Sequence, residues 1–350
     1  MEVLIVPLMQ ELPIVLLFMF IGVMLYLLGK GADILVVEAV ALSIRWQIPK
    51  VLIGATIVSL GTTLPEASVS VMAAVKGNPD LALGNALGSI ICDTGLIVGI
   101  AALISPLTLN KKIVNRQGWL QFFSGLLLIG SSIPVMLLLK NTGTKTMGSS
   151  IFYDNATINQ FTGFVFLSLL VVYMVITVQW SKFSSQDIQE EVGEEVDAKL
   201  ILLLLKLAAG VALIVLSSKV LIPTVEVTAL RIGIPQSIIA ATLVAFGTSL
   251  PELVTAITAA RHGHGDLAIG NVIGADILNV LFVVGAAAAV TPEGLPIPSY
   301  FFILQFPAMM FILFTFRMIK LFTVKEIKRW HGILLLGMYI SYTITSYTII

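Results

Sequence analysis

The chain consists mainly of apolar runs, each long enough to cross a lipid bilayer as one helix. A helix needs about 20 residues to span the hydrocarbon, and apolar residues make up 57% of this 350-residue chain. The runs lie near residues 13–44, 48–75, 80–104, 119–139, 160–180, 199–222, 235–260, 266–291, 299–316 and 331–350. Because lipid offers no hydrogen-bond partners to a peptide backbone, these ten runs predict an all-α membrane protein. We expect one long tilted helix from the first run, and a sixth helix that continues past Pro223.

Charge and cysteine content exclude several other classes of protein. Only 11% of the residues are charged, which is too few to cover a soluble globule of this size. The 20 basic and 20 acidic residues cancel, so no basic surface indicates a nucleic-acid partner. The single cysteine, Cys92, excludes an internal disulfide and a cysteine-built metal site.

Basic residues are unevenly distributed between the loops of the two sides. With the N-terminus outside, the cytoplasmic connections carry thirteen Lys and Arg residues and the outer connections carry four. Loops rich in Lys and Arg face the cytoplasm in multi-pass proteins. We therefore expect both termini outside a plasma or inner membrane, with the acidic linker 181–198 in the cytoplasm.

Residues 45–102 are repeated in residues 231–288. At an offset of 186 without gaps, 26 of 58 positions are identical. GTTLPE at 61–66 falls on GTSLPE at 247–252, and GNALGSIICD at 84–93 falls on GNVIGADILN at 270–279. Five runs, an odd number, separate equivalent points, so the two copies enter the membrane in opposite directions. We expect two inverted five-helix repeats, 1–180 and 199–350, with interrupted helices at the midplane, an architecture of secondary transporters.

Each copy contains a proline that interrupts its helix. Pro65 has no amide hydrogen, and its ring clashes with the carbonyl of Gly61. A carbonyl freed in hydrocarbon costs several kcal/mol unless a partner takes it up. A cation would serve, and more oxygens stand beside each break. These oxygens belong to Thr62, Thr63 and Glu66 in the first copy and to Thr248, Ser249 and Glu252 in the second.

Carboxylates recur near the middle of these runs. Glu66 and Glu252 are each followed 27 residues later by a polar side chain, Asp93 and Asn279 respectively. One charge at the bilayer centre costs about 2.5–3.5 kcal/mol, so three acids there need a function. Carboxylates, hydroxyls, an amide and free carbonyls suit calcium or an alkali cation. A proline-kinked helix whose Glu and Thr only satisfy nearby backbone is the structural alternative, and its repetition in two copies disfavours it.

The glycines of the second motif have a packing interpretation. Gly84 and Gly88 in the first copy correspond to Gly270 and Gly274 in the second. Small residues let membrane helices approach closely, so we expect all four at helix–helix contacts.

At these motifs the sequence resembles the cation/calcium exchanger superfamily, and within it the prokaryotic sodium/calcium exchangers. The resemblance covers nearly the whole chain and rests on the paired signatures G-T-[ST]-L-P-E and G-N-x-x-G-[SA]. It implies an antiporter that moves calcium outward against inward sodium, by alternating access around one midplane site. Glu66 and Glu252 would hold the central cation, helped by hydroxyl and backbone oxygens of Thr62 and Thr248.

The resemblance also implies flanking ligands. Ser249 would help to form an outward-side sodium site, and Ser89 would supply a hydroxyl on the inner side. The carbonyls of Ser59 and Ala245 would contribute oxygens to flanking sodium sites. The transported ions and the lipid bilayer are then the expected partners, with no cofactor and no obligatory protein partner.

The sequence departs from the family pattern in three ways. Asp93 and Asn279 are exchanged between the copies, which keeps one acid and one amide facing the centre. Ala275 lacks an expected hydroxyl, which leaves one sodium site short of a ligand. Asp276 is an additional acid where the first copy has Ile90. Asp276 either bonds to a neighbouring helix or replaces the missing oxygen.

Other functions remain open at this point. Calcium/proton exchange is the main alternative, and Asp276 leaves a potassium-dependent exchanger open. A cation sensor would bind calcium without moving it. No Ser/His/Asp or Cys/His constellation lies at midplane depth, which argues against an enzyme. Away from the motifs, Lys30 and Asp33 are three apart on one helix face and could form a pair, while Lys219 falls at the position equivalent to Asp33.

Overall fold

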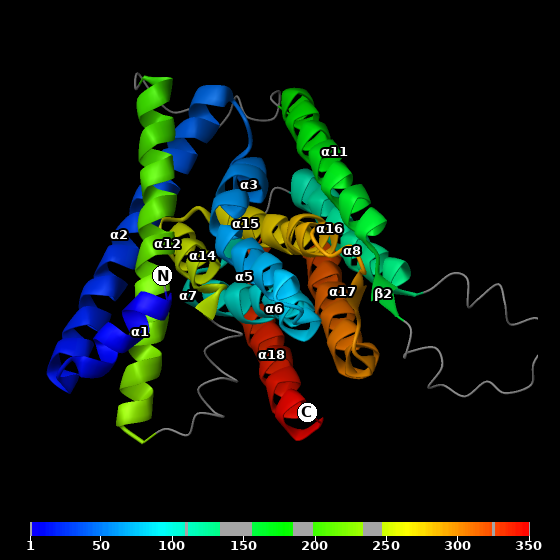
Figure 1. Ribbon diagram of the computed structural model, residues 1–350. Helices are drawn as coiled ribbons and strands as arrows, with labels where there is room; N and C mark the ends of the chain where they lie inside the picture. The colour runs from blue at the N-terminus through cyan, green and yellow to red at the C-terminus, as the bar shows by residue number, and fades with distance from the viewer. Residues whose placement is uncertain are drawn as a thin grey trace, which may run out of the picture.

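Two long helices, α2 (Ile14–Trp46) and α12 (Leu200–Arg231), pack along each other at one side of the molecule (Figure 1). The computed structural model describes residues 2–108, 111–133, 156–184, 199–233, 247–323 and 326–349. Both helices have the predicted length, and α12 runs through Pro223. They approach closely at Gly31 and Gly210, since a Cβ on Gly210 would lie 3.1 Å from the Gly31 carbonyl oxygen.

The other helical elements form the rest of the bundle. They are α3 (Lys50–Ile53), η1 (Gly54–Val58), α4 (Ser59–Thr62), α5 (Leu64–Val75), α6 (Pro79–Ile91), η2 (Cys92–Ile97), α7 (Val98–Ile104), α8 (Lys111–Ser132), α11 (Gln160–Ser184), α14 (Leu250–Arg261), α15 (Gly265–Leu278), η4 (Asn279–Val284), α16 (Gly285–Ala289), η5 (Phe301–Gln305), α17 (Phe306–Phe322) and α18 (Arg329–Ile349). The η elements are π-helical turns. A short helix that the sequence did not predict, α1 (Glu2–Glu11), packs on α12. Met9 of α1, Leu17 of α2 and Val227 of α12 form a small buried cluster there.

The expectation of ten membrane helices is met in part. Within the described residues, six helices are long and apolar enough to cross a membrane, or seven if the bent pair Lys50–Thr62 and Leu64–Val75 counts as one span. Helices α8 and α18, of 22 and 21 residues, match the length of expected runs. Residues 235–246 of the seventh run and residues 185–198 of the acidic linker lie outside the described part.

Two short strand pairs, absent from the sequence prediction, connect the halves of the chain. Strand β1 (Leu107–Thr108) pairs with β4 (Glu326–Ile327), and β2 (Thr157–Ile158) pairs with β3 (Leu295–Pro296), both antiparallel. Each pair joins a loop of the first half to a loop of the second. Because both joins cross between the halves, the two halves form one interlocked body.

Helix α15 packs closely against the start of the first motif region. A Cβ on Gly270 would overlap the Val51 carbonyl oxygen, and one on Gly274 would reach 2.5 Å from the Ala55 carbonyl oxygen. The predicted packing role of these two glycines is therefore confirmed. For Gly84 and Gly88, the equivalent neighbours would be residues 237 and 241, which lie outside the described part.

Charged side chains of α2 make contacts within the helix and with neighbouring elements. The Lys30 ammonium lies 4.0 Å from the Asp33 carboxylate, which confirms the expected pair. Asp33 also lies 3.5 Å from Nε2 of His262, at the end of α14. The Lys206 ammonium of α12 lies 3.0 Å from the Glu38 carboxylate of α2.

Candidate cation-binding site

The GTTLPE motif breaks its helix at Thr63. Helix α4 ends at Thr62 and α5 begins at Leu64, and the segments before and after the break are inclined by 45°. Pro65 lies in the first turn of α5, where a helix does not need its amide hydrogen. Because proline has no amide hydrogen, the carbonyl of Gly61 does not receive the helical hydrogen bond that another residue at position 65 would donate. Ser249 occupies the equivalent place before α14, with φ −86° and ψ 8°.

Each break brings a glutamate into the first turn of the helix that follows it. Glu66 stands in the first turn of α5 and Glu252 in that of α14. The positive end of a helix dipole favours a carboxylate there. Both side chains are buried, with 0% and 1% of their surface exposed, so the fold holds two acids in its interior.

The partner helices deliver their polar side chains at π-helical turns. Asp93 lies in η2 and Asn279 opens η4, and both are fully buried. Such wide turns are uncommon and often occur at functional sites. Asp93 and Glu252 are the acidic groups that interact electrostatically with Glu66. The structure therefore brings these acids together from α5, α14 and η2.

Most polar atoms of this cluster have no protein partner. Among the described residues, no hydrogen bond reaches either carboxylate oxygen of Glu66 or Asp93, Oε2 of Glu252, or the amide of Asn279. Buried polar groups are nearly always bonded, and leaving them unpaired is costly. These oxygens are the kind of ligands that coordinate a metal cation such as calcium, so the cluster is a candidate cation site.

Hydroxyl groups around the cluster connect the two halves of the chain. Thr63 donates to Oε1 of Glu252 at 3.3 Å, and Ser249 donates to the Ser89 hydroxyl at 3.2 Å. Ser89 and Ser249 are almost fully buried. These predicted ligands thus lie where the two halves meet, and each is hydrogen-bonded to an oxygen of the other half.

Two asparagines that we did not select as site residues lie beside the motif threonines. Thr248 donates to Oδ1 of Asn85 at 3.0 Å, and Thr62 lies at 3.5 Å from Oδ1 of Asn271. The threonine of each half thus faces the asparagine of the other. The signal was present in the sequence, since both asparagines are the N of the repeated G-N-x-x-G motif.

The Ser59 carbonyl is already occupied in this conformation. It accepts from the Thr63 amide at 2.9 Å and from the Thr62 hydroxyl at 3.3 Å. A carbonyl oxygen has two lone pairs, so a sodium ion could take it only after the Thr62 hydroxyl had turned away. Ala245, the corresponding candidate of the second half, lies outside the described residues.

Asp276 is bonded to neighbouring elements. Its Oδ2 accepts from Thr94 of η2 and from Gln121 of α8, each at 2.5 Å, while Oδ1 has no partner among the described residues. This geometry favours the first of the two interpretations of Asp276, an acid that bonds to other helices. Asp276 nevertheless interacts electrostatically with Asp93.

The spacing of the acids limits how they could hold an ion. In the described part of the chain, no three His, Cys, Asp or Glu side chains gather as ligands of one metal. Calcium takes 6–8 oxygen ligands. Hydroxyl, amide and backbone oxygens must therefore complete the coordination shell of any cation held here.

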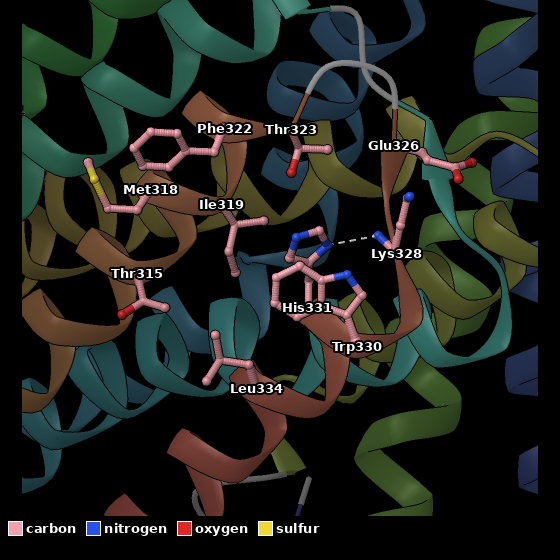
Figure 2. A pocket seen from close by; sticks show the side chains of 10 residues that line it. All are labelled: Thr315, Met318, Ile319, Phe322, Thr323, Glu326, Lys328, Trp330, His331 and Leu334. Atoms are coloured by element: carbon pink, nitrogen blue, oxygen red, sulfur yellow. Dashed lines mark hydrogen bonds between the residues drawn. The ribbon is translucent and has the colours of Figure 1, made fainter.

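A cavity of about 460 Å³ lies between α5, α12 and α14, beside the broken helices. Its described lining includes Pro65, Thr248 and Pro251 of the broken helices, and Lys76 and Lys219. A second cavity, of about 810 Å³, lies between α17 and α18 and is lined mainly by apolar side chains. Figure 2 shows its polar members, with the amide of Lys328 donating to His331. That cavity contains none of the candidate ligands.

Comparison with known proteins places these features in context. A family model described as sodium/calcium exchanger protein matches residues 16–179 and 202–348. The chain is 34% identical over 274 residues to the inner membrane protein YrbG of Escherichia coli (strain K12), covering 77% of this chain and 78% of that one. It is 29% identical over 350 residues to the sodium/calcium exchanger MaX1 of Methanosarcina acetivorans, covering 95% and 99%. The solved structure of the sodium-calcium exchanger NCX_Mj, soaked without Na⁺ and Ca²⁺, matches with a TM-score of 0.76 at 25% identity, over 96% of this chain and 100% of that one.

Proposed function

Because the chain belongs to the sodium/calcium exchanger protein family, we propose that it exchanges sodium for calcium across a plasma or inner membrane, by alternating access to one site. Glu66 and Glu252 hold the calcium ion. Asp93 and Asn279, together with the hydroxyls of Thr62, Thr63 and Thr248, complete the set of oxygens. Ser249 and Ser89 serve the flanking sodium sites, with the carbonyls of Ser59 and Ala245. The protein is a transporter and not an enzyme.

One observation carries this proposal. Glu66, Asp93 and Glu252 are buried acids that retain carboxylate oxygens without a partner in the described part of the chain. One calcium ion offsets two of the three negative charges, and several monovalent ions offset them as well, but calcium together with several monovalent ions would overcompensate the charge. Competition for the same oxygens therefore couples the two ions, and an empty site of three negative charges resists translocation through hydrocarbon.

The path to the site is proposed from the cavity beside α12. Its described lining includes Lys76, Lys219 and Thr248. Lys76 belongs to a loop that the distribution of Lys and Arg assigns to the outer side. We therefore assign this conformation to the outward-open side of the transport cycle, with both termini outside.

The overall topology that we propose is ten helices in two inverted repeats, 1–180 and 199–350, joined by the cytoplasmic linker 181–198. The crossed contacts of Thr62 with Asn271 and of Thr248 with Asn85 support it, because equivalent residues make equivalent contacts. The two strand pairs, each between the halves, support it as well.

The first experiment is uptake of radioactive calcium into proteoliposomes. An outward sodium gradient should drive uptake, and an outward proton gradient should not. Glu66→Gln should abolish the sodium-driven flux, because it removes one charge from the central ion while keeping the shape of the side chain. Glu293→Gln makes the same change at an exposed loop position and should transport like the wild type.

Two results would overturn the proposal. Unchanged calcium flux in Glu66→Gln, at matched amounts of protein, would show that Glu66 does not hold the transported calcium ion. Uptake driven only by protons would replace sodium by protons as the counter-ion. A potassium requirement would appear as sodium-driven calcium uptake that occurs only when potassium is also present.

A further inference from the structure

Helix α17 carries two basic side chains into the interior of the bundle. Arg317 is 1% exposed and Lys320 is 4% exposed. The Arg317 guanidinium stacks on the Trp119 ring of α8, 4.3 Å from its centroid, and its nitrogens have no hydrogen-bond partner among the described residues. Two buried cations in the interior of the bundle need an explanation, because buried charges are stable only when compensated.

The ammonium of Lys320 has a defined place on α8. It donates to Oε1 of Gln121 at 3.4 Å and lies over the Phe316 ring, 4.0 Å from its centroid. A Cβ at Gly118 would overlap the ammonium nitrogen. The glycine on α8 therefore leaves the space that the ammonium occupies.

Gln121 connects this ammonium to the acid at position 276. Its Nε2 donates to Oδ2 of Asp276 at 2.5 Å and to the Thr94 hydroxyl at 3.1 Å. The carbonyl end of the amide thus faces the cation, and its nitrogen faces the anion. This is the orientation that a positive and a negative charge would impose on the amide between them. Asp276 is also the acidic group that acts electrostatically on Lys320.

Lys320 also balances the charge count of the centre. Asp276 stands where the first motif copy has Ile90, so it adds a fourth acid to Glu66, Asp93 and Glu252. Asp276 interacts with Asp93, so this extra charge reaches the ion site. A fixed cation bonded to Asp276 through Gln121 offsets the charge that Asp276 adds.

We propose that Lys320 is a tethered counter-cation for Asp276, which takes the place of a monovalent ion there and thereby sets how many sodium ions compete with one calcium ion. The inference rests on the proposed exchange function and assigns Lys320 and Gln121 as positioning residues. Asp276 then acts on the bound ions through its charge, while the Lys320 ammonium takes the place that a sodium ion would otherwise occupy beside Asp276.

The test is competition between sodium and radioactive calcium on purified protein in detergent, with choline as the inert cation. The slope of calcium displacement against sodium concentration reports the number of competing sodium ions. Lys320→Met should raise the slope by about one, because the Asp276 carboxylate, left without its counter-cation, takes up a sodium ion. Lys320→Arg should keep the wild-type slope, and Lys320→Met with Asp276→Asn should restore it.

Several results would overturn the inference. An unchanged slope in folded Lys320→Met would do so, as would a raised slope that persists in the double variant. If Lys320→Met alone does not fold, the double variant must fold, since it buries neither charge. Failure of both variants would contradict the pairing.

A further measurement separates this inference from the exchange function. Melting temperatures without sodium or calcium should be lower for Lys320→Met than for the double variant, whether or not the wild type transports ions. A wild type that binds no calcium would refute the exchange function alone. A wild type that binds calcium in competition with sodium, while neither slope nor melting temperature shows coupling, would refute the counter-cation alone.

Discussion

Asn85 and Asn271 occupy equivalent positions of the repeat, but their hydrogen bonding differs. Asn85 donates to the Glu66 carbonyl oxygen at 3.1 Å and to the Ser70 hydroxyl at 2.9 Å, and it accepts from Thr248. The amide nitrogen of Asn271 has no partner among the described residues, and one acceptor is missing there because Ala256 stands where the first half has Ser70. Asn85 therefore fixes the Glu66 backbone, whereas the amide nitrogen of Asn271 makes no such bond to a described residue.

This difference leads to a paired prediction. Asn85→Leu should lower the free energy of unfolding by about 1–3 kcal/mol more than Asn271→Leu, since it leaves more buried groups unpaired. Asn85→Leu should also weaken calcium binding, because the Glu66 backbone loses its anchor. Melting curves in detergent and calcium titrations measure both effects, and equal melting temperatures of the two variants would contradict the assignment.

Among the elements, α15 depends most on close backbone contact. Gly270 and Gly274 lie against the carbonyls of Val51 and Ala55. The Ala55 carbonyl, in η1, also accepts from the Tyr173 hydroxyl at 3.1 Å, so α11 satisfies a carbonyl that the π-helical turn frees. The position of α15 in turn decides where Asp276 and Asn279 stand.

Gly270→Ala tests this contact. The added methyl group would overlap backbone atoms, which cannot move as a side chain does, so we expect a loss of about 1–3 kcal/mol in stability. Gly22→Ala is the matched control within a helix. No described atom lies within 4 Å of a Cβ at Gly22, so the alanine there should leave stability unchanged or raise it. Fluorescence-detected melting of both variants measures the difference, and equal curves would reject the close contact.

At the scale of the whole molecule, the buried acids repel one another, and the proposed bound cation would offset this repulsion. The two halves contribute Glu66 and Asp93 on one side and Glu252 on the other. In the proposed function, ion binding would therefore join elements that otherwise repel each other. The same ion should stabilise the entire fold, because it binds the native state and not the unfolded chain.

Calcium removal is the corresponding measurement. At 100 times its dissociation constant, calcium should stabilise the protein by about 2.7 kcal/mol, which corresponds to a rise in melting temperature on the order of 5 °C. A chelator should reverse the rise. Magnesium should not reproduce it, because it dehydrates reluctantly and demands a tighter octahedral shell. Glu252→Gln should lose the rise, and an equal rise in that variant would place the calcium ion elsewhere.

Much of this description was predictable from the sequence alone. The membrane helices, the two helix breaks and the buried acids all follow from local rules. A run of about 20 apolar residues in lipid has to be helical, a proline removes one backbone donor, and a mid-membrane acid needs a purpose. Each rule acts within one window of the chain, so no knowledge of the distant sequence was required.

The tertiary structure alone decided which polar groups meet. Thr62 and Asn271 are 209 residues apart in the sequence, and Lys320 and Gln121 are 199 apart. Ile90 and Asp276 occupy equivalent positions of the repeat, and nothing local says that Asp276 bonds to α8 and η2. Such contacts depend on how helices pack against one another, and packing is a property of pairs of elements that no single window of the sequence contains.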